Sequence, residues 1–358
     1  MKSKYSIGIL GATGMVGQRF IQLLEHHPWF QVDWLAASDR SSGKTYGEAA
    51  KWRLDTPLPE RIARMMVSPA EPEGAPKIVF AALDAVIARE LEPRFANAGC
   101  AVVSNSSAYR MAPNVPLVIP EINAVHLHLI EEQPSRRDSG GYMVTNPNCS
   151  TIGLVMALKP LEERFGIDQI FVATMQAVSG AGYPGVPSMD ILGNVIPYIG
   201  SEEEKMEAET LKLLGRLQGH AVTPLAARMT AHCNRVAVED GHTESVSIKL
   251  ATPATREEIL AAWAEFCPLA GQGLPTAPEQ PVEWAPQPDR PQPRLDRNRG
   301  HGMAVTVGRL RPCGLLDWKF TVLSHNTIRG AAGAAILNAE LLASLGKLDP
   351  VAVATAQG

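Results

Sequence analysis

The sequence predicts an α/β protein of two domains, the first built on a parallel sheet and the second, of α+β type, on a mostly antiparallel sheet. In the first third of the chain, short β-branched segments alternate with helical segments, which is typical of a parallel sheet with right-handed crossovers. In the later part, longer segments alternate apolar and polar residues, as expected of antiparallel strands with one solvated or interface face. The length of 358 residues suffices for two ordinary domains.

The elements of the first domain follow in order along the chain. A glycine-rich turn and the helical pattern "QRFIQLLEHH" follow the first short strand, and a second helical stretch lies around 89–98. The predicted strands are 5–10, 30–40, 77–83 and 100–107.

The second domain contains the longer alternating segments. Its predicted strands are 169–180, 243–250, 302–312 and 315–324. The proline-rich stretch 274–300 is either a linker or an extended excursion within this domain, and we favour the excursion because strand patterns resume directly after it.

The end of the chain is predicted to return to the first domain. The segment 328–345 is an Ala/Gly-rich helix whose small residues permit close packing against that domain. We therefore expect the first domain to comprise 1–148 plus 327–358, and the second to comprise 149–326.

Composition narrows the class of protein. The net charge of −4 argues against a nucleic-acid surface or a polybasic membrane anchor, and no apolar run reaches eighteen residues. Five cysteines are scattered, which fits neither a disulfide framework nor a CxxC metal site. We expect reduced thiols, a cytoplasmic protein and no metal.

A glycine-rich loop near the N-terminus predicts a dinucleotide site. In "SIGILGATGMVGQ", Gly11, Gly14 and Gly17 join a strand to a helix. Glycines there let backbone amides approach a pyrophosphate, and the N-terminus of the helix favours its negative charge. The strand before and the helix after are the context that this interpretation requires, so the first domain is predicted to be Rossmann-like.

The end of the second strand indicates which dinucleotide binds. In "ASDRSSGK", Ser38, Arg40, Ser41 and Lys44 together suit a 2′-phosphate, whereas Asp39 would suit a free ribose hydroxyl. The balance predicts NADP over NAD.

A cysteine follows the turn "NPN" at the start of an apolar helical run. Cys149 would feel the positive end of the helix dipole, which favours a thiolate, and Ser150 and Thr151 offer capping hydroxyls. The alternative, a small buried thiol without a chemical role, is about equally compatible with this stretch. A nucleophilic thiol needs a proton-transfer partner; His242, at a turn directly before a strand, is the better candidate, and His232 is its rival.

Several motifs in order resemble one family over about residues 5–346. They are "GATGMVG", "SNSSAYRM", "NPNCSTIG", "TMQAVSGAGYPGVPS", "EEEKMEAET", "CNRVAVEDGHTES" and "HNTIRGAAGAAILNAE". Together they resemble aspartate-semialdehyde dehydrogenase in its archaeal and fungal-type branch. The resemblance implies NADP-dependent reductive dephosphorylation of β-aspartyl phosphate, with release of phosphate, in the biosynthesis of lysine, threonine, methionine and isoleucine.

The resemblance also implies roles for individual residues. Cys149 would be the acylated nucleophile, His242 the general acid/base, and Gln176 would orient the substrate near the thiol. Arg235 would bind the substrate carboxylate, and Glu202 its ammonium group, although Glu203 or Glu204 could fill that place. The phosphate would be bound by Lys205, Arg110 and Asn148. The cofactor would contact Gly11, Thr13, Gly14, Met15, Val16, Ser38, Arg40, Ser41, Ser179, Gly180 and Asn326.

Three alternatives remain open at this point. A malonyl-CoA or succinyl-CoA reductase resembles the same branch and also reduces a thioester, while N-acetylglutamyl-phosphate reductase fits the motifs less well. A non-enzymatic NADP-binding sensor would keep the fold without the chemistry. The resemblance further implies a homodimer or homotetramer assembled through the sheet of the second domain.

Overall fold

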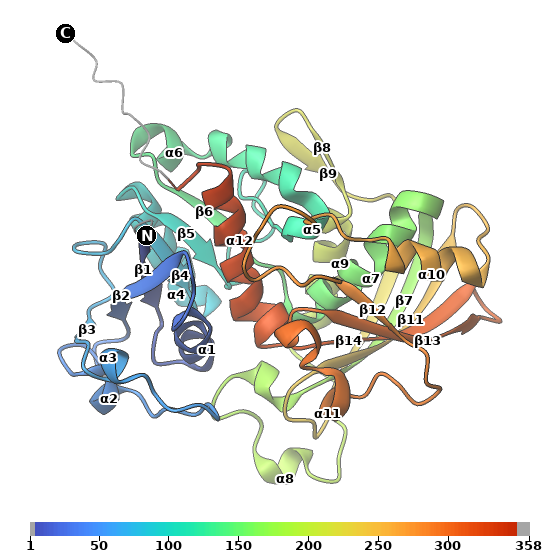
Figure 1. Cartoon of the computed structure of the whole chain (residues 1–358), viewed down its shortest axis with the longest axis horizontal. Helices are drawn as coiled ribbons and strands as arrows, with labels where there is room; N and C mark the ends of the chain where they lie inside the picture. Colours follow the sequence, from blue (N-terminus) through green and yellow to red (C-terminus); the bar gives the residue numbers. More distant parts are fainter. Residues whose placement is uncertain (1–3, 349–358) are drawn as a thin grey trace.

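The computed structural model describes residues 4–348. Figure 1 shows two sheets side by side, with helix α12 running back beside the first one. Residues 349–358, which the predicted first domain includes, lie outside the described part of the chain, as do residues 1–3.

The first sheet has six strands, all parallel, in the order β3-β2-β1-β4-β5-β6. This is the strand order of a doubly wound dinucleotide-binding sheet, so the predicted fold class is confirmed. All four predicted strands are present, whereas β3, which has only two residues, and β6 were not predicted. The strands are β1 Tyr5–Leu10, β2 Phe30–Ala36, β3 Val67–Ser68, β4 Ile78–Ala81, β5 Ala101–Ser104 and β6 Tyr142–Thr145.

Helices flank this sheet. The helix α1 begins directly after Gly14, earlier than predicted, and buries Phe20, Ile21 and Leu24 against the core. The crossover between β4 and β5 is α4, which starts four residues before the predicted stretch. The helices up to β6 are α1 Met15–Leu24, α2 Tyr46–Ala49, α3 Glu60–Ala63, α4 Ala85–Asn97, α5 Pro120–Asn123, η1 Ala124–Glu132 and α6 Pro134–Asp138.

The second sheet is mixed, in the order β10-β7-β11-β14-β13-β12. Its three central pairings are antiparallel, as expected, but both edge strands pair in parallel. Its strands are β7 Ile167–Gln176, β10 Arg228–Arg235, β11 His242–Leu250, β12 Val282–Ala285, β13 Val305–Pro312 and β14 Trp318–Ser324; β8 Arg216–Gln218 and β9 Ala221–Thr223 form a separate hairpin.

Both parallel edge strands were missed by the sequence analysis. The strand β12 lies inside the proline-rich stretch 274–300 and pairs with β13, so that stretch is part of the second sheet and not a free linker. The strand β10 was not recognised because polar residues dominate "RMTAHCNR". Both strands are edges, where a mixed or proline-flanked sequence is tolerated.

One face of the second sheet is covered by helices, and the other is open. The long helix α7, Cys149–Phe165, packs on the covered face, and its Ala157 carbonyl accepts a 2.9 Å hydrogen bond from Trp263 Nε1. On the open face, Phe171 and Met175 of β7 are exposed. The other helices here are η2 Val178–Ala181, α8 Ser188–Ile191, α9 Glu202–Leu213, α10 Arg256–Ala264, α11 Pro293–Asp296 and η3 Arg299–Gly302.

The chain returns to the first domain through a π-helical turn, η4 Ile328–Ala332, and α12 Gly333–Ser344. Ile336 and Leu337 of α12 lie in the same hydrophobic core as Ile7 and Phe80 of the first sheet, and α12 runs beside that sheet (Figure 1). Between residues 4 and 348, no helix is long and apolar enough to cross a membrane.

Candidate active site

Cys149 is the first residue of α7, at the positive end of the helix dipole. The turn residue Asn148 caps the helix: its Oδ1 accepts hydrogen bonds from the backbone N–H groups of Ser150 (2.8 Å) and Thr151 (3.2 Å). The expectation that the hydroxyls of Ser150 and Thr151 cap the helix is therefore wrong, because the preceding amide side chain already occupies the cap.

The thiol of Cys149 faces His242, the first residue of β11. Sγ and Nε2 are 3.2 Å apart, and the other ring nitrogen, Nδ1, accepts a 3.0 Å hydrogen bond from the backbone N–H of Ala177. The rival, His232, is exposed on the opposite face of the sheet, where its ring lies 5.7 Å from that of Phe171. Of the two candidate histidines, the fold brings only His242 to the cysteine.

Burial dominates the electrostatics of this pair. It raises the pKa of the Cys149 thiol to about 12, and the negative charge of Glu202 adds to the rise. Burial also lowers the pKa of His242 to about 3, with a further contribution from the guanidinium of Arg235. Both shifts favour the uncharged forms of the pair, a thiol and a neutral imidazole.

Arg235, at the end of β10, lies beside this pair. Its Nη1 donates a 2.7 Å hydrogen bond to the carbonyl oxygen of Ala177. A Cβ on Gly180 would lie only 2.8 Å from Arg235 Nη1 and 3.1 Å from His242 Nε2. The chain passes this close to both side chains because position 180 has no side chain of its own.

Glu202 begins α9 and is buried in the same site. Its Oε1 accepts hydrogen bonds from Asn148 Nδ2 (2.8 Å) and Gln176 Nε2 (3.2 Å). Glu203 instead accepts a hydrogen bond from the backbone N–H of Cys233, and the side chain of Glu204 is exposed. Of the three glutamates, the fold therefore places Glu202 with the cysteine.

Sequence reasoning missed Glu209, which lies on the same face of α9 as Glu202 and Lys205. Its Oε1 pairs with Arg110 Nη1 at 3.0 Å, and its Oε2 accepts the backbone N–H of Asn148 at 2.7 Å. The spacing of 202, 205 and 209 is helical and would have identified this face.

The guanidinium of Arg110 is held from two sides. Besides its bond to Glu209, it donates from Nη2 to the carbonyl oxygen of Asn105 at 2.8 Å. Its Nε is buried without a hydrogen-bond partner. Arg110 is thus fixed beside the N-terminus of α7, and its Nε–H remains unpaired.

Asn326 joins two segments next to His242. Its Oδ1 accepts the backbone N–H of Gly241 at 2.8 Å, and its Nδ2 donates to Ser179 Oγ at 2.8 Å. These two hydrogen bonds hold the start of β11 in place relative to η2, the turn that carries Ser179 and Gly180.

A cavity of about 960 Å³ opens at the N-terminus of α1. Gly14 precedes this helix and leaves its backbone amides uncovered, whereas Cβ atoms on Gly11 and Gly17 would clash with backbone carbonyls at 2.3 and 2.4 Å. These features suit a pyrophosphate at the helix N-terminus. Of the predicted cofactor residues, those lining the cavity are Gly11, Thr13, Gly14, Met15, Val16 and Ser38.

Arg40 and Ser41 lie in the exposed turn that follows β2. The turn closes with a 2.8 Å hydrogen bond from the Ser41 N–H to the Ser38 carbonyl, and the ammonium of Lys44 donates to the Arg40 carbonyl at 2.8 Å. Asp39 lines the cavity together with Ser38. A cofactor bound at this end of the cavity would therefore lie near both the carboxylate of Asp39 and the hydroxyl of Ser38.

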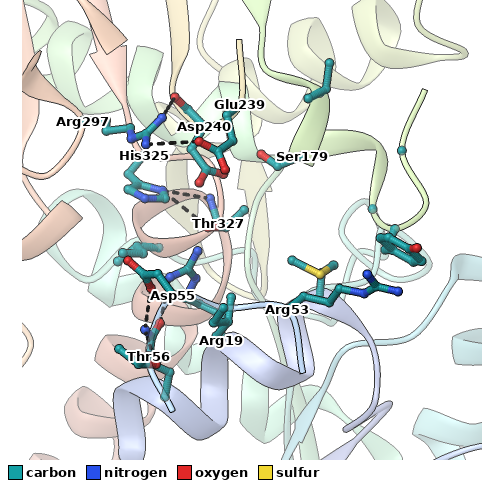
Figure 2. A pocket seen from close by; sticks show the side chains of 18 of the residues that line it. Arg19, Arg53, Asp55, Thr56, Ser179, Glu239, Asp240, Arg297, His325 and Thr327 are labelled. Carbon is teal, nitrogen blue, oxygen red and sulfur yellow. Dashed lines mark hydrogen bonds and ion pairs between the residues drawn. The ribbon is translucent and has the colours of Figure 1, made fainter. Parts of the chain in front are cut away.

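A second cavity of about 730 Å³ continues from the first between α1 and the second domain (Figure 2). Met15, Arg53 and Tyr183 line both cavities, and the Arg53 guanidinium stacks 3.8 Å from the centre of the Tyr183 ring. Ser179 and His325 line the inner wall of this second cavity, and the hydroxyl of Ser179 accepts the hydrogen bond from Asn326. The two cavities together lead from the glycine loop to Ser179 and His325, whereas Cys149 and His242 line neither of them.

The part of the chain that the structure describes contains no group of three His, Cys, Asp or Glu side chains arranged to hold a metal ion. The chain combines a doubly wound sheet and its glycine loop with a cysteine at the start of α7 that faces a histidine of the second sheet. These features define a thiol-dependent nicotinamide oxidoreductase.

Comparisons with known proteins identify the family within this class. Residues 6–130 match the semialdehyde dehydrogenase NAD-binding domain, and residues 158–329 match the semialdehyde dehydrogenase dimerisation domain. Aspartate-semialdehyde dehydrogenase of Archaeoglobus fulgidus is 53% identical over 95% of this chain and 98% of its own length. The enzyme of that name from Saccharomyces cerevisiae is 47% identical over 96% of this chain and 98% of its own.

A solved structure agrees with the sequence relatives. The crystal structure of aspartate-semialdehyde dehydrogenase with NADP from Candida albicans superposes with a TM-score of 0.89, at 44% identity, over 96% of this chain and 100% of the other. The chain belongs to the aspartate-semialdehyde dehydrogenase family, and its similarity to archaeal and fungal members confirms the resemblance drawn from its motifs.

Proposed function

We propose that this chain is an NADP-dependent aspartate-semialdehyde dehydrogenase that converts β-aspartyl phosphate to aspartate semialdehyde and phosphate through a thioester on Cys149. The observation that carries the proposal is the 3.2 Å pair of Cys149 and His242 at the N-terminus of α7, with Arg235 and Glu202 beside it. A nucleophile with a cation and an anion beside it suits a zwitterionic amino-acid substrate.

Each charged group of the substrate has a matching group in the site. The guanidinium of Arg235 suits the α-carboxylate, because it presents two parallel donors to a planar anion. Glu202 suits the α-ammonium group and is already held by Asn148 and Gln176. Arg110, which Glu209 links to the backbone of Asn148, and Lys205, on the Glu202 face of α9, are the cations proposed to bind the phosphate.

In the proposed reaction, each of these groups has a separate role. Cys149 attacks the acyl carbon, so an S–C bond forms and the C–O bond to phosphate breaks. Bound NADPH supplies the hydride that reduces the resulting thioester. The backbone N–H of Cys149, which the Asn148 side chain leaves uncapped, and the side chain of Gln176 are the proposed donors to the negative oxygen that develops at the same carbon.

The cofactor is assigned as NADP. The NADP-containing Candida albicans structure supports this assignment, and the cavity at the N-terminus of α1 has the size and the open amides for a dinucleotide. Ser38, Arg40 and Ser41 are the proposed partners of the 2′-phosphate, while Ser179, Gly180 and Asn326 are those of the nicotinamide end.

The protein is further proposed to be a cytoplasmic homodimer, or a tetramer of two such dimers, with domains at 1–148 plus 327–358 and at 149–326. The match to a dimerisation domain supports self-association. So do the exposed Phe171 and Met175 on the open sheet face and the exposed Met189 and Tyr198 beyond η2.

A spectrophotometric assay with aspartate semialdehyde and NADP tests the function. We expect NADPH formation that depends on added phosphate. Formation that requires coenzyme A instead, with malonate or succinate semialdehyde as the better aldehyde, would reassign the chain to the acyl-CoA reductases. Cofactor binding without turnover on any of these substrates would indicate a sensor.

A further inference from the structure

We propose that Arg329 is a positioning residue for Cys149: its buried ion pair with Glu121 holds the π-helical turn η4 where Gly330 packs against the nucleophile. This inference rests on the proposed function. The side chain of Arg329 is fully buried and lines neither of the two cavities at the glycine loop and α1. Any effect of Arg329 on the reaction must therefore pass through the residues that it holds.

The side chain of Arg329 joins η4 to two other helices. Its Nη1 donates a 2.7 Å hydrogen bond to Glu121 Oε1 on α5, and its Nη2 lies 2.9 Å from the sulfur of Met156 on α7. Both charged side chains of the pair are fully buried. Because the guanidinium is a rigid planar fork, these two contacts fix its direction as well as its position.

The next residue of η4, Gly330, packs directly against Cys149. A Cβ added to Gly330 would lie 2.8 Å from the Cβ, 3.0 Å from the Cα and 3.1 Å from the carbonyl oxygen of Cys149. In the turn before Cys149, Asn146 Nδ2 donates a 3.1 Å hydrogen bond to the carbonyl oxygen of Ala331. A displacement of η4 would therefore move the backbone that carries the thiol, and with it the 3.2 Å approach of Sγ to His242.

The backbone of η4 has an uncommon form. The N–H of Gly330 donates to the carbonyl oxygen of His325 at 2.9 Å, five residues earlier in the chain. The N–H of Ala332 donates in the same way to the carbonyl oxygen of Thr327 at 3.2 Å. Turns of this π-helical kind are rare and occur frequently at functional sites.

The ion pair is better suited to placing this turn than to stabilising the fold. A buried ion pair adds little net stability over apolar residues of similar volume, because both charges lose their hydration. Its fixed geometry, in contrast, holds η4 in one orientation against α5 and α7. The pair of Arg329 and Glu121 therefore serves the placement of Gly330 against Cys149.

The variant Arg329→Lys tests the positioning role. Lysine keeps a positive charge beside Glu121, but a single ammonium group does not reproduce both contacts of the guanidinium. Because a misplacement of about 1 Å can cost a hundredfold in rate, we expect kcat to fall by roughly ten- to a hundredfold. The KM for aspartate semialdehyde should change little, since Arg235 and Glu202, which are proposed to bind it, belong to β10 and α9.

The variant Arg290→Lys is the matched control. Arg290 pairs with Asp296 of α11, whose side chain is fully buried, and neither residue lines the two cavities. We expect a comparable fall in the denaturant midpoint of both Lys variants, with kcat lowered only in Arg329→Lys. Loss of kcat in both variants, or in neither, would overturn the inference.

A double variant separates positioning from stability. Glu121→Leu combined with Arg329→Met removes both charges, so the fold no longer contains an unpaired buried ion. We expect this variant to regain the denaturant midpoint of the unmodified protein while its kcat stays low, because two apolar side chains do not fix the orientation of η4. Recovery of kcat together with stability would show that the pair has a structural role alone.

A further measurement needs no substrate. The rate at which iodoacetamide alkylates Cys149, followed by peptide mass at pH 8, reports the reactivity of the thiol. We expect alkylation to slow several-fold in Arg329→Lys and to keep its rate in Arg290→Lys, because only the first variant displaces the thiol from His242. An unchanged rate in Arg329→Lys would overturn the inference. If alkylation followed the expected pattern but the unmodified protein turned over none of the proposed substrates, the proposed function alone would fail.

Discussion

Arg110 and Glu209, 99 positions apart in the chain, form a buried ion pair of 3.0 Å beside the N-terminus of α7. The second oxygen of Glu209 accepts the backbone N–H of Asn148, the residue before Cys149. One carboxylate thus fixes both a cation proposed to bind phosphate and the turn that presents the nucleophile.

Replacing Glu209 by Gln tests this link. The amide oxygen can still accept from Asn148, but Arg110 is left buried without its counter-charge. We expect the free energy of unfolding to fall by about 3 kcal/mol or more, as measured for broken buried pairs, and the KM for phosphate to rise. Denaturant unfolding and initial rates check this, with the exposed Glu204→Gln as the control, expected within about 0.5 kcal/mol of the unmodified protein.

Removing the thiol tests the covalent route. Cys149→Ala should abolish turnover, because no neighbouring group replaces the sulfur nucleophile, while binding of NADP, measured by fluorescence titration, stays unchanged. Cys267→Ala, which removes a partly exposed thiol far along the chain, serves as the control. Substantial activity in the Cys149 variant would rule out a thioester intermediate.

Adding a methyl group at Gly180 should disturb the site without unfolding the protein. The new Cβ would lie 2.8 Å from Arg235 Nη1 and 3.1 Å from His242 Nε2, so both side chains must shift. Because misplacement by about 1 Å can cost a hundredfold in rate, we expect kcat/KM to fall by roughly that factor in Gly180→Ala. Gly314→Ala is a matched control, since its Cβ meets no atom within 4 Å. Equal activity of the two variants would contradict the geometry.

Glu244 predicts a pH-dependent stability. This side chain follows His242 by two positions on β11; both its carboxyl oxygens are buried without partners, and burial raises its pKa well above the usual value. In the window between the unfolded and the folded pKa, the native state binds more protons than the unfolded state. Its contribution therefore stabilises the fold at acid pH and is lost as pH rises through that window.

The variant Glu244→Gln should remove this dependence. We expect its free energy of unfolding, measured with denaturant, to exceed that of the unmodified protein by a margin that grows from pH 5 to pH 8, with a limiting slope of about 1.4 kcal/mol per pH unit. The control variant Glu257→Gln, at an exposed position, should differ from the unmodified protein by the same free energy of unfolding at every pH. If the difference in free energy of unfolding for Glu244→Gln instead became smaller as pH rises, the carboxyl group of Glu244 would be ionised in the folded protein.

Arg40 tests the choice of cofactor. If its guanidinium binds the 2′-phosphate, Arg40→Ala should lower kcat/KM for NADP by roughly ten- to a hundredfold, the value of one or two charge-assisted hydrogen bonds, and leave kcat/KM for NAD unchanged. Arg64→Ala, at an exposed ion pair with Glu60, is the control. An equal loss with both cofactors would place Arg40 outside the 2′-phosphate site.

Much of the fold could be predicted because its signals are local. The glycine loop between a strand and a helix, the turn before Cys149 and the alternation of the central strands each depend on neighbours within a few residues. The edge strand β12 could not be predicted in this way, since its pairing with β13 compensates for a proline-rich sequence that has no strand pattern of its own.

The sequence by itself determined the order of the elements, the cofactor loop and the cysteine at a helix start, because these follow from backbone conformation and local side-chain chemistry. Only the tertiary structure decided which partners meet that cysteine. Alternate residues of a strand point to opposite faces, so Arg235 of β10 enters the site while His232, three positions earlier, faces away. His242 and Glu209 join Cys149 and Arg110 from distant parts of the chain, because packing of α7 against the sheet and α9 brings them together.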